Sequence, residues 1–320
     1  MKYYMGIDIG NTKTQYTLAD ENGKVVSDHK GNGTNHQGIG QEETYQRLNK
    51  GISSLLKLAN VAKSDISFTY LGACGADTPD EFVMLRKLFN KLLEPIPFDF
   101  NNDGIIALKN GVELESGIVI TCGTGNTNFA INKQGEIGRI GGLNEWLGDT
   151  FGATIIARKV TYAATRSYDE RDFPSILPRR LCHALNIKEI FDLINYDDFD
   201  SDMIKKINQT FFAVADDGDG LALELVWEFT KEIIRIMEYF LLRYFDKKEK
   251  FRLALDGPVF KSNYKAFITM INLAVKERYP KAEIIVPESP PVLGALYFAF
   301  EKDGKLSSDI ILNLKKSYTN

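Results

Sequence analysis

The sequence predicts an α/β protein of two domains, each built on a mixed sheet with a β-meander and flanking helices. Residues 3–28 are typical of strand, tight turn, strand, turn and strand, because apolar or Thr/Tyr-rich runs alternate with Gly/Asn turns. Residues 116–140 repeat this order, and a shift of 112 positions places Thr12 on Thr124. A repeated meander in a chain of 320 residues favours two domains of related construction.

The remaining elements follow from hydrophobic spacing and capping residues. Apolar side chains recur at helical intervals over 41–59, and Thr78-Pro79 is an N-cap followed by proline at the first helical position. The tail after Gly304 is expected to be partly ordered at best. Further helices are expected at 78–89, 104–110, 151–167, 174–185, 201–215, 220–245, 261–279 and 291–302, and further strands at 66–73, 97–103, 251–257 and 282–287.

Composition argues against several classes of protein. The net charge is -4, with 39 basic and 43 acidic residues, so no electrostatic footprint for nucleic acid or an anionic membrane is present. The most apolar long window, 221–245, carries seven charged residues and cannot span a bilayer. Cys74, Cys122 and Cys182 lie far apart without a C-x-x-C pair, and the apolar run after Lys2 is too short for a signal peptide. We therefore expect a cytoplasmic protein.

The first candidate site is the glycine turn after the first strand. Asp8 ends a buried strand, and Gly10, Asn11, Thr12 and Lys13 follow it. Small residues let backbone N–H groups approach phosphate oxygens, Thr12 and Lys13 add donors, and Asp8 is placed to hold Mg²⁺ through water. A simple hairpin turn with a capping aspartate explains the same residues about equally well.

The second candidate is the matching turn of the second meander, Gly123-Thr124-Gly125-Asn126. Two such turns in equivalent elements could face each other across a cleft and bind a polyphosphate from both sides. The Walker A pattern G-x-x-x-x-G-K-[ST] is absent from the sequence.

Three further candidates carry acids or glycines at the ends of strands. Asp103 follows the strand PFDF, at the position where open α/β sheets bind ligands. Its carboxylate could accept a proton from an attacking hydroxyl. The alternative is that Asp103 belongs to an ordinary Asn-Asp-Gly turn. In GGLNEWLGDTFGA (141–153), Asp149 could bind a sugar hydroxyl. Trp146 could pack on the face of a sugar ring, although a core role is expected for it. Gly257-Pro258 follows a strand and could approach an adenosine through its backbone.

Nearly the whole chain, from Gly6 to about Ala299, resembles the BadF/BadG/BcrA/BcrD-type ATPases and, within them, the N-acetylglucosamine kinases. No single motif is decisive, but the ordered set is specific. The segments that carry the resemblance are GIDIGNTKT, GTNH (33–36), LGACGADTPDEFVMLRKLF, NDG (102–104), CGTGN, LGD (147–149), ADDGD (215–219), GPVFKSN (257–263) and PPVLGAL (290–296).

The resemblance implies two actin-like (ribonuclease H-like) domains, 1–112 with about 291–320 and 113–290, with an ATP cleft between them. It implies an ATP-dependent sugar kinase that phosphorylates an amino sugar such as N-acetylglucosamine and uses ATP and Mg²⁺. A homodimer is compatible with the sequence, which does not give the oligomeric state. Asp103 would be the catalytic base and, with Asp8, would lie near Mg²⁺. The remaining implied contacts are Asn11, Thr12, Lys13, Gly123, Thr124, Gly125, Asn126, Ala215, Gly257 and Pro258 for ATP, and Asn35, Asp103, Gly142 and Asp149 for the sugar.

The chain departs from the family beside the implied sugar site. Leu143-Asn144 stands where the family usually has Trp-Gly, and Thr150 replaces its glutamate. Three alternatives stay open: an ATPase that activates a partner enzyme through a shared iron–sulfur cluster, a non-catalytic sugar-sensing protein, and a type III pantothenate kinase. The first needs suitably placed thiolates, and Cys74 and Cys122 lie in apolar strand contexts typical of inert thiols.

Overall fold

The structure is a computed structural model that describes residues 2–196, 198–246, 250–262 and 264–318. The chain forms two compact units, Met1–Glu115 with Pro287–Asn320 and Ser116–Val286. Each unit contains one five-stranded mixed sheet with flanking helices, which confirms the predicted fold class.

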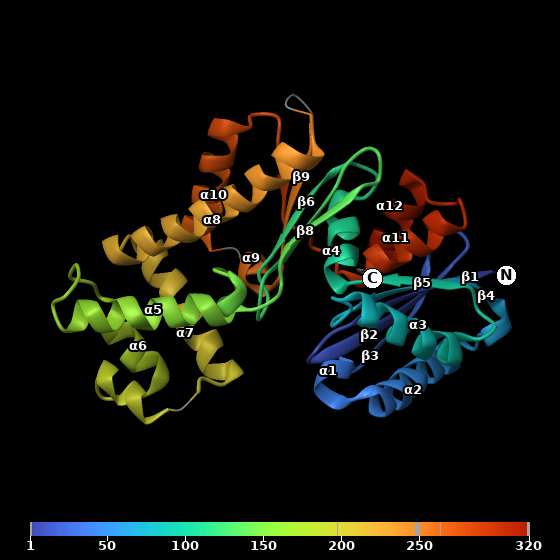
Figure 1. The fold of residues 1–320 in the computed structure, drawn as a ribbon, viewed down its shortest axis with the longest axis horizontal. Coiled ribbons are helices and arrows are strands. Elements are labelled where there is room, and N and C mark those ends of the chain that lie inside the picture. Colours follow the sequence, from blue (N-terminus) through green and yellow to red (C-terminus); the bar gives the residue numbers. More distant parts are fainter. Residues whose placement is uncertain (1, 197, 247–249, 263, 319–320) are drawn as a thin grey trace. The chain divides into compact units, whose positions relative to one another are not determined.

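The first unit has the strand order β3-β2-β1-β4-β5. The meander β1–β2–β3 is antiparallel, whereas β1, β4 and β5 run parallel, so their carboxyl ends share one edge of the sheet. Figure 1 shows α2 and α3 on one face and α4, α11 and α12 on the other. The strands are β1 (Tyr3–Ile9), β2 (Lys13–Asp20), β3 (Val25–Asn32), β4 (Ile66–Ala73) and β5 (Phe98–Asn101). The helices are α1 (His36–Ile39), α2 (Gln41–Ala59), α3 (Pro79–Leu93), α4 (Asp103–Val112), α11 (Val292–Lys302) and α12 (Ser308–Tyr318), with a 3-10 turn at Lys63–Asp65.

Alternation along β1 builds the core of this unit on both faces of the sheet. Met5 and Ile7 join the cluster formed with α2 and α3. Tyr4 stacks on Phe300 of α11 with ring centroids 4.0 Å apart. Gly6 lets α11 close on the sheet, because a Cβ there would lie 2.8 Å from the carbonyl oxygen of Val292.

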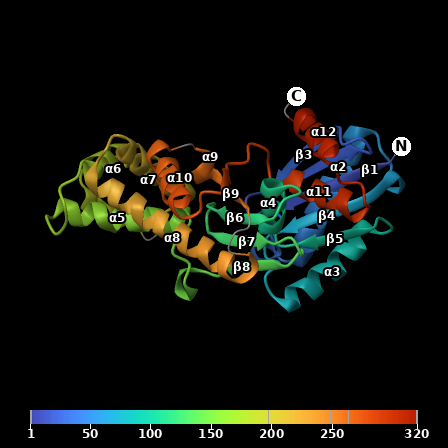
Figure 2. The same cartoon turned by 90° about the horizontal axis from the view of Figure 1, so that it is seen from above.

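The second unit has the strand order β10-β9-β6-β7-β8, with β6, β9 and β10 parallel and β6–β7–β8 antiparallel. Figures 1 and 2 both show α5, α6, α7, α8 and α10 gathered to one side of this sheet. The strands are β6 (Gly117–Thr121), β7 (Thr127–Ile131), β8 (Ile137–Gly141), β9 (Arg252–Asp256) and β10 (Glu283–Ile285). The helices are α5 (Ala153–Tyr168), α6 (Leu177–Leu185), α7 (Ser201–Asp216), α8 (Gly220–Tyr244), α9 (Pro258–Lys261) and α10 (Lys265–Arg278), with 3-10 turns at Glu145–Leu147 and Ile190–Asn195.

The long helix α8 packs against β6, β7 and β8. Its stripe at helical spacing, which includes Phe229, Ile233, Met237 and Phe240, is buried in the core of the unit. The stripe is therefore part of the core.

Two expectations about elements need correction. The expected helix 261–279 is observed as α10, which begins at Lys265 after the short α9 has ended at Lys261; residue 263 lies outside the described residues. The tail is ordered over α12, because Ile311 and Leu314 are buried and the Ser317 hydroxyl accepts a 2.9 Å bond from the backbone N–H of Val25. Within the described residues, none of the helices combines the length and the apolar character that a membrane crossing requires.

Candidate active site

The first glycine turn is built into the β1–β2 hairpin and is covered by the segment after β3. The N–H of Gly10 donates to the carbonyl of Lys13 at 3.1 Å, and the N–H of Gly33 donates to the carbonyl of Thr12 at 3.0 Å. A Cβ on Gly33 would overlap the backbone carbonyl of Asn11, so only glycine allows this approach. The side chains of Asn11, Thr12 and Lys13 are exposed and therefore available to a ligand.

Asn35 joins the predicted sugar-binding segment to the predicted phosphate turn. Its buried amide Nδ2 donates to Oδ1 of Asn11 at 2.6 Å and contacts Sγ of Cys74 at 3.6 Å. Its Oδ1 accepts from the N–H of Gln37 at 3.1 Å and so caps α1. The sequence-predicted residues Asn11 and Asn35 therefore lie in direct contact.

Carboxylates from three segments converge at the shared edge of β1, β4 and β5. The pKa of Cys74 is raised from 9.0 to about 12. Burial is the main cause, and the negative charges of Asp103, Asp77 and Asp8 contribute to the same rise. Asp8 lies near the end of β1, Asp77 follows β4 and Asp103 follows β5, so the strand order places these carboxylates at the same edge of the sheet as Cys74. A thiol held in its neutral form does not favour ligation of an iron–sulfur cluster.

Asp103 is the first residue of α4 and is half-buried. Its Oδ1 accepts from the N–H of Gly104 at 3.1 Å, at the helix terminus where a negative charge is favoured. Asn102 caps the same helix through Gly104 at 2.9 Å, and its Nδ2 donates to Asp77 at 3.0 Å. Asp77 therefore fixes Asn102, the N-cap residue that directly precedes Asp103. Sequence reasoning missed Asp77, although it lies in the quoted segment LGACGAD.

The second glycine turn is held by the start of α5. The N–H groups of Ala153 and Thr154 donate to the carbonyls of Gly123 at 2.9 Å and Thr124 at 3.3 Å. Thr124 and Gly125 are exposed, whereas Asn126 is buried and its amide bonds to Asn128 at 2.9 Å. Asn126 therefore stabilises the turn from inside, while Thr124 and Gly125 are accessible to a ligand.

The turn after β9 lies against the second glycine turn. The N–H of Cys122 donates to the carbonyl of Asp256 at 2.8 Å. Gly257 has φ +108°, and a Cβ there would collide with the backbone of Cys122, so the position requires glycine. Pro258 then begins α9 and is exposed.

A cavity of about 260 Å³ joins these two turns within the second unit. Its lining includes the predicted residues Gly123, Thr124 and Pro258, and also Asn208 of α7, which sequence reasoning missed. Ala215 of α7 is 2% exposed in the core of the unit and does not line this cavity. The ADDGD segment that contains it supplies helix caps: the carboxylate of Asp216, for example, accepts from the N–H of Ala266 at 2.7 Å.

The glycine loop after β8 is organised by Asp149. Its carboxylate accepts from the N–H of Gly142 at 3.1 Å and of Leu143 at 2.9 Å. Burial raises the pKa of Asp149, and the two backbone hydrogen bonds oppose that rise. Trp146 is 97% exposed, so the expected core role for this residue is wrong.

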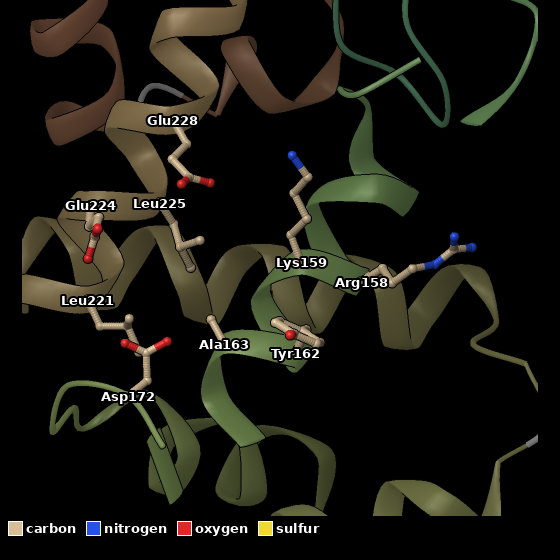
Figure 3. Close-up of a pocket in the computed structure, with 9 residues that line it drawn as sticks. All are labelled: Arg158, Lys159, Tyr162, Ala163, Asp172, Leu221, Glu224, Leu225 and Glu228. Carbon is tan, nitrogen blue, oxygen red and sulfur yellow. The ribbon is translucent and has the colours of Figure 1, made fainter. Parts of the chain in front are cut away.

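A second cavity of about 410 Å³ lies between α5 and α8 (Figure 3). Leu221 and Leu225 contribute apolar surface, and Lys159 and Glu228 contribute charges from the two helices. None of the sequence-predicted site residues lines it, and no glycine turn opens onto it. The smaller cavity is therefore the better candidate for a nucleotide.

Comparison with known proteins identifies the family of the chain. Residues 5–299 match the model of the BadF/BadG/BcrA/BcrD ATPase family, so the chain belongs to that family. It is 26% identical to the N-acetyl-D-glucosamine kinase of Dictyostelium discoideum over 92% of this chain and 97% of that protein. It is 27% identical to the N-acetylmuramic acid/N-acetylglucosamine kinase of Clostridium acetobutylicum over 93% and 98%. A solved structure from Porphyromonas gingivalis, a candidate N-acetylglucosamine kinase, has a TM-score of 0.69, 18% identity and coverage of 95% and 100%.

Proposed function

We propose that this protein transfers the γ-phosphate of ATP to a hydroxyl of an amino sugar, N-acetylglucosamine or a related N-acetylhexosamine. The observation that carries the proposal is the placement of Asp8, Asp77 and Asp103 at the carboxyl ends of three neighbouring strands, with Asn35 bonded to Asn11 of the adjoining glycine turn. The full-length curated relatives, which are named as kinases of N-acetylglucosamine and N-acetylmuramic acid, support the same reaction.

In the first unit, Asp103 would accept the proton of the attacking sugar hydroxyl. Its place at the start of α4, fixed by the cap of Asn102 and by Asp77, suits a base that must keep one orientation. Asn35 would bind a second sugar hydroxyl, since its amide is buried and already fixed by two neighbours. Such prior ordering lowers the entropy lost when the substrate binds.

In the second unit, the exposed Thr124 and Gly125 would bind phosphate oxygens, and the turn at Gly257 and Pro258 would border the nucleoside. Asn11, Thr12, Lys13, Gly123 and Asn126 would complete the phosphate contacts or shape the turns. We take the two compact units as the two predicted domains, and the cleft between them stays a prediction. Asp149 and Gly142 would bind the sugar from their loop.

Mg²⁺ would be held by Asp8 and Asp103 together with the phosphates of ATP. Magnesium is commonly bound by one or two carboxylates plus substrate phosphates and retains several waters, so two aspartates at one sheet edge fit it. When bound, the ion would offset negative charge on the phosphates during transfer. We place the protein in the cytoplasm with a small sugar as its substrate.

The proposal is tested by coupled ADP release with ATP-Mg²⁺ against N-acetylglucosamine, glucosamine, N-acetylmuramic acid, N-acetylmannosamine and glucose. We expect release that depends on an N-acetylated sugar, with the product confirmed as a sugar phosphate by mass spectrometry. Slow release that is the same with every sugar and without any sugar would contradict the proposal. The departures at Leu143 and Thr150 make the order of preference among N-acetylated sugars the informative result.

A further inference from the structure

Asn208, one of the residues that line the cavity of about 260 Å³ in the second unit, has a buried acceptor without a partner among the described residues. Asn208, on α7, is 5% exposed and lines the cavity. Its Nδ2 donates to the carbonyl of Ala153 at 2.9 Å, which fixes the orientation of the amide. Its Oδ1 has no hydrogen-bond partner among the described residues. Because buried polar atoms are almost always paired, this oxygen indicates a missing donor.

The rest of the lining defines what kind of donor would fit. Ile204, Pro258 and Val259 give the cavity apolar walls, and Tyr264 adds an aromatic ring that stacks on Phe212 with centroids 4.3 Å apart and planes 12° apart. A flat heterocycle gains from such walls, and an exocyclic amine on that heterocycle would supply an N–H. The same cavity reaches the glycine turn at Gly123, where phosphate groups are expected.

We infer that Asn208 selects the base of the nucleotide, with its Oδ1 accepting a hydrogen bond from the 6-amino group of adenine. This inference rests on the proposed function, because it assumes that the nucleotide enters this cavity. Guanine carries a carbonyl oxygen at the same ring position, so two acceptors would face one another and the oxygen of Asn208 would stay unpaired. A site built around such a bond rejects ligands that lack the donor.

The test compares kcat/KM for ATP, GTP and the triphosphate of purine riboside, which lacks the 6-amino group, at a saturating concentration of the accepted sugar. We expect the native protein to prefer ATP over both analogues by about tenfold or more, the size of one hydrogen bond to a desolvated acceptor. Asn208→Leu should bring the ATP-to-purine-riboside ratio to within about threefold of unity. Lys206→Leu, at an exposed position of the same helix paired with Asp202, should keep the native ratio.

The ratio separates base selection from a structural role. If Asn208 only ties α7 to Ala153, its loss lowers the values for all three nucleotides together and leaves their ratios unchanged. That result, or a native protein that uses ATP and the purine riboside analogue equally well, would overturn the inference. If Asn208→Leu does not fold, Asn208→Ala, which also removes the oxygen, is compared in the same way. If no sugar supports ADP release, the proposed function fails separately, and calorimetric binding of the three nucleotides to the native protein still measures the preference.

Discussion

Replacing Asp103 with asparagine removes the proposed base while changing the shape of the site very little. Asparagine keeps an Oδ1 atom that can accept from the N–H of Gly104, which is now 3.1 Å from the Asp103 oxygen. The cap of α4 belongs to Asn102 and is unaffected. The helix loses one favourable charge in its first turn, worth about 0.3–1 kcal/mol. The fold should therefore survive the change.

Activity should fall far more than stability. A positioned acid–base group contributes roughly 10²–10⁴-fold, so we expect kcat to drop at least about 100-fold. That factor corresponds to about 2.7 kcal/mol of transition-state stabilisation, well above the expected loss of folding free energy. KM for the sugar should change less than kcat, because asparagine can still hydrogen-bond a hydroxyl.

The measurement pairs the coupled ADP-release assay with a thermal unfolding curve followed by circular dichroism. Asp80→Asn is the matched control, because Asp80 also lies in the first turn of a helix, α3, where its charge is favoured but no reaction is proposed. Both variants should unfold within a few degrees of the native protein, and only Asp103→Asn should lose transfer. Near-native kcat for Asp103→Asn, with a native melting curve, would refute the role of Asp103 as base.

Three further predictions concern stability. Gly257→Ala should lower the melting temperature by an amount equivalent to about 1–3 kcal/mol or more, because φ is +108° and the new Cβ meets Cys122. The control Gly220→Ala, with open space around it, should be neutral or stabilising. Equal effects of the two substitutions would contradict this prediction. Leu314→Ala should lower the free energy of unfolding, measured with denaturant, by about 2–5 kcal/mol. Leu312→Ala, at a residue that is 47% exposed on the same helix, should lower it by less than about 1 kcal/mol. A small effect at Leu314 would mean that α12 is not part of the fold. Stability should fall as pH rises from about 9 towards 12, because burial raises the pKa of Cys74 in the folded protein from 9.0 to about 12 and the unfolded chain therefore releases that proton first. The midpoint of denaturant unfolding should be lower at pH 10.5 than at pH 8, and the difference should be smaller in Cys74→Ala. An unchanged midpoint in the native protein would contradict the assignment.

Local patterns were sufficient for much of the fold. The meanders, the capped start of α3 at Thr78 and the apolar stripe of α8 each depend on residues a few positions apart, so the sequence displays them directly. The tail failed as a local prediction, because α12 is ordered by contacts with β-strand residues such as Val25 that are remote in the chain. Tertiary packing therefore overrode a weak local signal.

The same division applies to the candidate site. Sequence alone determined which residues could do chemistry: the glycine turns and Asp103 are visible as types and spacings, and Asn35 is implied by the family resemblance. Only the tertiary structure decided that Asp77 supports Asn102, that Trp146 is exposed, and that Asn208, which lines the cavity beside Gly123, has an unpaired buried oxygen. The physical reason is that a hydrogen-bond partner or a degree of burial is set by which distant segments meet, whereas a turn or a cap is set by the few residues that form it.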